Sequence, residues 1–293
     1  MILSRLVAKG VGEVEKTFPN GLERIVRAMN VGICIVAGVG VIADAQTRSD
    51  EYLQLPSQAR PVQGIVMPVP KEIFRTLDQF HSANWPAIKR PEIAIWKSRG
   101  EQAQIASLLG ITIAEGFIAM EAKDSAEVKS IGNSVLKLSR GLAVEERALR
   151  RSRSILEHTE RAEWGGARDE WDGVLADLEN GMIEIKSMDL AQLVSIAGWL
   201  RGTEALSELV LEDYSEQRSE LIRQPALLDS LEKQILAMSP AIQSDRIVAQ
   251  MLQGLRRIRA LIIIDNTPIT EAAVREIHGI CSELVQLSGR PSG

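Results

Sequence analysis

The spacing of apolar residues after Pro70 is the feature that most restricts the fold of this chain. Apolar side chains recur every three or four positions from there almost to the C-terminus, which is the period of an amphipathic α-helix. Apolar and polar residues nowhere alternate for more than a few positions, as a half-buried strand would require. We therefore predict an all-α fold over residues 71–288, an irregular multi-helix bundle of about eight or nine helices, followed by a disordered tail at 289–293.

The limits of the helices follow from the apolar pattern and from residues that favour helix ends. Asp124, with Glu127 three residues later, is a capping box and predicts a helix over 125–139. Asp189 is the expected N-cap of a helix over 190–211. Further helices are expected at about 73–80, from 91 or 100 to 122, and at 144–160, 164–187, 215–222, 225–238, 244–264 and 270–288.

Prolines divide the stretch ahead of the helices, residues 46–70. Each proline fixes its own φ and pushes the preceding residue toward extended geometry. Apolar residues fill the positions between them, and the prolines are Pro56, Pro61, Pro68 and Pro70. We predict an extended Pro-rich strap that lies across the helical body.

The N-terminal segment carries the pattern of an export signal. Residues 31–43 are all apolar or glycine, two arginines precede them, and Ala43 and Ala45 occupy the −3 and −1 positions of a cleavage site. The run is shorter than the ~20 residues that a membrane-spanning helix needs. We expect residues 1–45 to be cleaved off, which makes the protein periplasmic or secreted. The alternative is an uncleaved anchor at 31–43, again with the body outside the cytoplasm.

Two octets resemble each other. Residues 103–110 read AQIASLLG and residues 191–198 read AQLVSIAG, with four identities. Each ends in a glycine, Gly110 or Gly198, with another small residue one turn further on. Glycine within a helix costs about 1 kcal/mol relative to alanine, so a close approach of two helix backbones is the economical explanation. We predict that these helices are central and pack on each other, through either a duplication or a shared packing requirement.

Charge and motif content exclude several functions. The net charge of −5 opposes wholesale binding to a phosphate backbone, so we expect no nucleic-acid partner. The three histidines have no metal-ligand spacing, and the sequence contains no P-loop, GxGxxG or GxSxG motif, so no cofactor or metal is expected. Cys34 lies in the predicted signal, which leaves Cys281 as a single thiol that we interpret as buried and structural.

Glu115 is the most unusual polar residue. In the helix that ends near Ala122 it lies on an apolar face, where burial raises a carboxyl pKa unless a cation pairs with it. Arg201 and Glu204, in the helix of the second octet, are its natural partners. The group is either a salt bridge between packed helices or a polar cluster that lines a ligand cleft.

Arg147, Arg150 and Arg151 share one face of the helix expected at 144–160. Such a patch could bind a phosphate or another anion. Acidic residues of the same helix supply partners three and four positions away, which favours a solvated, salt-bridged surface instead. These residues are Glu145, Glu146, Glu157 and Glu160.

The sequence thus predicts an exported bacterial envelope protein that is not an enzyme. Its role would be to bind an unknown protein or small-molecule ligand, or to serve as a structural domain. It would meet the membrane only through its N-terminal segment, if that is retained. The alternative is a hydrolase or other enzyme with a dispersed polar site around Glu115 and Arg201.

Overall fold

The computed structural model describes residues 61–62, 65–66, 76–77, 80, 83–90, 101–263 and 267–289. The chain divides into two units, Met1–Ser49 and Asp50–Gly293, and every described residue belongs to the second. The expected export signal, its apolar run and most of the strap lie outside the described residues.

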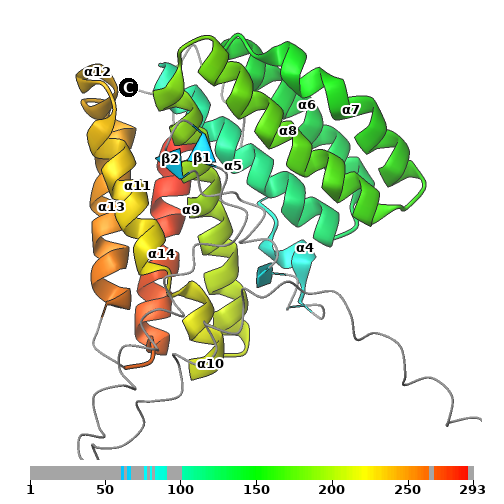
Figure 1. The fold of residues 1–293 in the computed structure, drawn as a ribbon. Helices are drawn as coiled ribbons and strands as arrows, with labels where there is room; N and C mark the ends of the chain where they lie inside the picture. The colour runs from blue at the N-terminus through cyan, green and yellow to red at the C-terminus, as the bar shows by residue number, and fades with distance from the viewer. Residues whose placement is uncertain are drawn as a thin grey trace, which may run out of the picture. The chain divides into compact units, whose positions relative to one another are not determined.

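The described residues form an all-α structure, which confirms the predicted fold class (Figure 1). Its long helices are α5 (Gln102–Glu121), α6 (Ser125–Gly141), α7 (Glu145–Glu160), α8 (Trp164–Glu184), α9 (Met188–Glu212), α11 (Pro225–Ala237), α13 (Arg246–Ile262) and α14 (Glu271–Gly289). The short ones are α4 (Trp85–Ile88), α10 (Glu216–Ser219), α12 (Pro240–Gln243) and the 3-10 helix η1 (Glu220–Ile222). In the strap, β1 (Pro61–Val62) pairs antiparallel with β2 (Ile65–Val66).

One kind of turn joins α5, α6, α7, α8 and α9 in succession. Each turn has three residues between the helices, and in each the second of the three has a positive φ: Lys123 (54°), Ala143 (58°), Ala162 (55°) and Lys186 (61°). The next backbone N–H donates to a carbonyl five residues earlier, as in a Schellman motif: Asp124 to Ala119 (3.0 Å), Val144 to Ser139 (3.0 Å), Glu163 to His158 (2.9 Å) and Ser187 to Met182 (2.8 Å). The chain therefore reverses four times, and α9 runs in the same direction as α5.

Helices α5 and α9 form the centre of the described structure, as the octets predict, and contact each other more extensively than any other described pair. A Cβ built on Gly110 would lie 2.0 Å from the carbonyl oxygen of Val194 and 3.0 Å from the backbone nitrogen of Gly198. The two backbones therefore touch at the octets. All residues of α5 from Ala103 to Met120 are buried.

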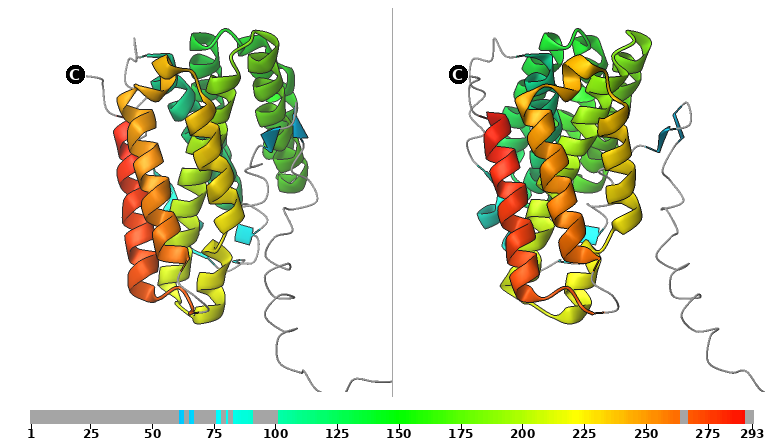
Figure 2. Two further views of the ribbon diagram at one scale, coloured as in Figure 1. Left: turned by 60° about the vertical axis from the view of Figure 1, so that its left-hand side comes forward. Right: turned by 90° about the vertical axis from the view of Figure 1, so that its left-hand side faces the viewer.

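Two groups of helices flank this central pair. Helices α6, α7 and α8 form one group, and α11, α13 and α14 form the other, with α14 packed along α9 (Figures 1 and 2). The indole of Trp171, on α8, lies against Gly116 of α5 and donates a hydrogen bond of 3.0 Å to the carbonyl of Ile113. The glycine at 116 leaves the room that this large ring occupies.

Some helix limits differ from the expected ones. Asp124 caps α6 as predicted, accepting from the N–H of Glu127 at 3.0 Å. The prediction for Asp189 was wrong, because α9 begins at Met188, two residues before the expected start, and its N-cap position is Ser187. Asp189 lies in the first turn of α9 and accepts a bond of 3.0 Å from the N–H of Ser239. Helix α14 includes Gly289, so the expected tail at 289–293 began one residue too early.

Candidate functional site

The residues singled out around Glu115 come together in what we call the buried charge cluster. It consists of Glu115 on α5, Arg201 and Glu204 on α9, and Arg90 in the segment that follows α4. Glu115, Arg201 and Glu204 are 5%, 0% and 1% exposed. The side chain of Arg90 keeps 28% of its surface exposed, so it is the one member that reaches solvent.

Glu115 and Arg201 form the ion pair at the centre of the cluster. The Nε of Arg201 donates to Oε1 of Glu115 at 2.5 Å, and its Nη2 donates to the carbonyl of Ile88 at 2.6 Å. The other oxygen of Glu115 accepts from the backbone N–H of Arg90 at 3.4 Å. The pair therefore holds the end of α4 and the segment that follows it against both central helices.

Glu204 forms an ion pair with the second arginine of the cluster, Arg90. The Nη2 of Arg90 pairs with Oε1 of Glu204 and donates to the hydroxyl of Ser282, on α14, at 2.7 Å. Nη1 of Arg201 lies 3.4 Å from Oε2 of Glu204, but neither of these two atoms has a hydrogen-bond partner among the described residues. Two guanidinium groups face two carboxylates, so the cluster has no net charge.

Burial is the largest single influence on the pKa of both Glu115 and Arg201. It raises the pKa of Glu115, against the opposing charge of Arg201. Burial also opposes the charge on Arg201, but Glu115 and Glu204 outweigh it and raise the pKa of the guanidinium. Cys281 is fully buried nearby, and burial together with the negative charge of Glu204 raises its pKa. This thiol is a poor nucleophile, as its structural interpretation requires.

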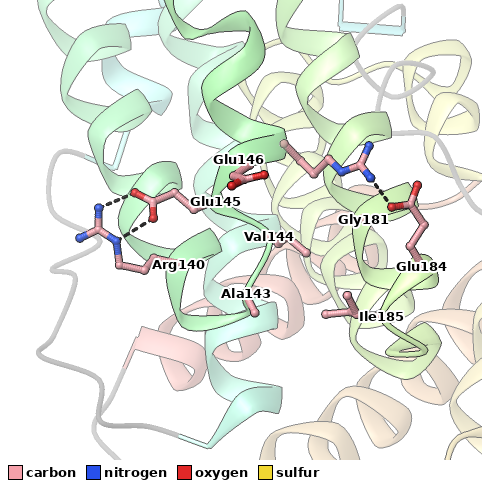
Figure 3. Close-up of a pocket in the computed structure, with 9 residues that line it drawn as sticks. Arg140, Ala143, Val144, Glu145, Glu146, Gly181, Glu184 and Ile185 are labelled. Atoms are coloured by element: carbon pink, nitrogen blue, oxygen red, sulfur yellow. Dashed lines mark hydrogen bonds and ion pairs between the residues drawn. The ribbon is translucent and has the colours of Figure 1, made fainter.

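A surface pocket of about 430 Å³ lies where the turn between α6 and α7 meets the end of α8 (Figure 3). Two ion pairs line it. Arg140 binds Glu145 through two nitrogens, and Arg147 pairs with Glu184. The lining residues are Arg140, Ala143, Val144, Glu145, Glu146, Arg147, Gly181, Glu184 and Ile185. Three carboxylates thus face two guanidinium groups, a balance that does not favour an anion.

Of the three arginines of the expected anion patch, Arg147 and Arg151 face α8, and Arg150 is exposed. Arg147 lines the pocket of Figure 3, whereas Arg150 and Arg151 do not. Arg151 forms ion pairs with two carboxylates of α8, Asp177 at 3.0 Å and Glu170 at 2.9 Å. Arg150 is exposed and has no ion-pair partner within the described part of the chain. The partners of Arg147 and Arg151 therefore come from α8 and not, as expected, from α7 itself.

Sequence reasoning missed the feature that places these arginines. Glycines of α8 lie opposite long polar side chains of α7, and a Cβ on each glycine would meet that side chain at less than 3 Å. The three pairs are Gly166 with His158, Gly173 with Arg151, and Gly181 with Arg147. The glycine spacing of seven and eight residues within one helix was the available signal.

A second missed contact joins α8 to α9. The hydroxyl of Ser195, which is fully buried, donates to Oε1 of Glu179. The side chain of Glu179 is half-buried, and it has no ion-pair partner in the regions that the structure describes. Burial raises the pKa of Glu179 to about 7, and the bond from Ser195 only partly opposes this.

Two further properties of the described ranges concern metals and membranes. No group of three or more His, Cys, Asp or Glu side chains there is arranged to hold a metal ion. One described helix, α5, is long and apolar enough to cross a membrane, but it is fully buried by the other helices. The central place of α5 in the bundle therefore explains why this helix is long and apolar.

The chain was also compared with known proteins. No family model, no curated protein and no solved structure matches it. Function is therefore inferred from the chain's own residues.

Proposed function

We propose that this chain is an exported, non-enzymatic helical domain that binds a partner or a small ligand or serves a structural role in the bacterial envelope. The observation that carries the proposal is the closure of the buried charge cluster. Both oxygens of Glu115 bond within the protein, and the guanidinium of Arg201 is fully buried. A catalytic carboxylate or a ligand-binding arginine needs a free face toward its substrate.

The position of the cluster supports a structural role. It joins four parts of the fold, namely the segment after α4, the central helices α5 and α9, and α14 through Ser282. Breaking one partner of a buried pair leaves an uncompensated charge, whereas replacing both by apolar groups is often neutral. Stability measurements therefore distinguish a structural clamp from a functional cleft.

The test is the substitution Glu115→Gln, measured by denaturant unfolding of the mature chain. We expect a loss of about 3–5 kcal/mol, because the charge of Arg201 stays buried without its partner. The double variant Glu115→Leu with Arg201→Met should recover much of that loss. A free energy of unfolding for Glu115→Gln at or above that of the wild type would contradict the proposal.

One observation favours the alternative, an enzyme with a dispersed polar site around Glu115 and Arg201. Nη1 of Arg201 and Oε2 of Glu204 are buried without hydrogen-bond partners among the described residues, and such atoms are sites for a bound water or ligand group. Under this alternative Glu115→Gln costs little stability, because active sites are held at some expense to the fold. The same unfolding experiment decides between the two.

The location outside the cytoplasm is part of the proposal and rests on the apolar run at 31–43 with its flanking residues. Expressed with its own N-terminus in a Gram-negative host, the protein should appear in the periplasm or medium. N-terminal sequencing should begin at Gln46. Recovery of the full-length chain from the cytosol would contradict export, and a full-length chain in the membrane fraction would instead support the uncleaved anchor.

A further inference from the structure

A small apolar cavity of about 130 Å³ lies among α6, α7 and α8, away from the buried charge cluster. Eight of its lining residues are apolar: Val128, Val135, Leu136, Ala148, Ile155, Leu156, Trp171 and Val174. Four others are polar or small: Lys129, Gly132, Asn133 and Ser152. An apolar cavity of about 150 Å³ stays dry and takes up benzene, so this one is of the size that holds a single ring or a short aliphatic chain.

Gly132, on α6, keeps part of the cavity lining open. A Cβ built at this position would meet no atom within 4 Å. Glycine inside a helix costs about 1 kcal/mol relative to alanine, and here no close approach of another helix accounts for it. Gly132 is one of the residues that line the cavity, so a larger side chain at this position would add bulk to the cavity wall.

The charge beside the cavity is positive. Lys129 is the one charged residue among those that line it, and it is exposed without an ion-pair partner in the described ranges. Asn133, one turn further along α6, offers an amide next to it. An ammonium group and an amide donor at the edge of an apolar hollow complement a carboxylate on an apolar body.

We propose that this cavity binds one small monocarboxylate, with an aromatic ring or short aliphatic chain among α6, α7 and α8 and its carboxylate at Lys129. The ligand needs an apolar body about the size of benzene, since the cavity is too small for a long acyl chain. The inference gives a ligand class to the binding role proposed above and rests on it. The stability experiment on Glu115 tests the charge cluster, so the two proposals fail separately.

The experiment is isothermal titration of the mature chain with benzoate, benzene and benzylamine. Benzoate and benzene should both bind, and benzoate should bind more tightly than benzylamine because the lysine attracts one and repels the other. Lys129→Gln should weaken benzoate about two- to fivefold, the range for an exposed charge pair, and should leave benzene unchanged. Equal affinity for benzoate and benzylamine would overturn the role of Lys129.

A matched pair of glycine variants tests the cavity itself. Gly132→Leu should abolish binding of benzoate and benzene, because the added side chain occupies the space at the cavity. Gly279→Leu makes the same change at a helical glycine of α14 where a Cβ also meets no atom within 4 Å, and it should bind both probes like the wild type. Melting curves of both variants should show a folded protein. Absence of benzoate binding in the wild type, or its persistence in Gly132→Leu, would overturn the proposal.

Discussion

The α5–α9 pair and the α7–α8 pair both rely on glycine, but they use it differently. In the central pair, Gly110 lets one backbone touch another, with the Val194 carbonyl 2.0 Å from the place of its missing Cβ. In the α7–α8 pair, Gly173 lies opposite the guanidinium of Arg151. Backbone atoms are fixed by the helix that contains them, whereas the end of an arginine can move to another rotamer. A glycine is therefore indispensable only where its neighbour is rigid.

The arginines of the two regions differ in the same way. Arg201 is fully buried and its carboxylate partners come from both central helices. Arg151 keeps 37% of its side chain exposed while pairing with two carboxylates of α8. Water compensates a broken pair at the second site but not at the first, so similar contacts contribute very different free energies of unfolding.

The largest difference should appear when the two glycines are changed to alanine. We expect Gly110→Ala to lower the free energy of unfolding by about 2–3 kcal/mol, because the new methyl group forces the two backbones apart. We expect Gly173→Ala to stay within about 1 kcal/mol of the wild type, since the gain in helix propensity offsets weakened ion pairs of Arg151.

Urea denaturation of both alanine variants measures these values. Gly279→Ala is the control, because it adds the same methyl group to open space and reports the helix propensity alone. The contrast between the two regions would be refuted by equal losses at positions 110 and 173.

A pH-dependent effect is expected from Glu179, at the contact between α8 and α9. Its pKa is raised from 4.5 to about 7 in the folded protein, mainly by burial. Between these values the folded chain keeps a proton that the unfolded chain has released. Stability from this group is therefore greatest below about pH 4.5, declines as the pH rises to 7, and levels off above that.

Unfolding free energies measured from pH 4.5 to 8 test this. Glu179→Gln should flatten the decline, because its amide oxygen still accepts from Ser195 but does not titrate. Glu184→Gln is the control on the same helix, since Glu184 is 59% exposed. If Glu179→Gln and the wild type have the same slope, Glu179 is not the group that titrates.

Sequence reasoning predicted the fold well where one physical signal dominates. The apolar period gave the helices, and the capping box at Asp124 gave the start of α6. The two octets gave the central pair, because a glycine within an apolar helix costs stability unless another backbone packs against it. Glu115 and Arg201 were paired correctly for a similar reason, since an isolated charge on an apolar face needs an opposite charge.

Other features depend on contacts that local sequence does not reveal. Arg90 enters the charge cluster from a segment whose pattern predicts no helix, and only the tertiary fold places it beside Glu204. The sequence did not reveal the four turns that connect consecutive helices from α5 through α9. Their positive-φ positions are Lys123, Ala143, Ala162 and Lys186, where glycine is the usual residue. The apolar cavity arises where α6, α7 and α8 pack imperfectly, and the sequence of any one of these helices does not predict it.

The four repeated turns also set the order in which the protein can assemble. Each turn brings together helices that are neighbours in the sequence, so the hairpins from α5 to α9 form from short-range contacts. The contact between α5 and α9 is different, since Glu115 and Arg201 are 86 residues apart. At a synthesis rate of about 5–20 residues per second, α5 is complete several seconds before its main partner. Throughout that interval the apolar helix α5 is only partly covered by other helices. That interval is therefore the stage of synthesis at which a chaperone would matter most.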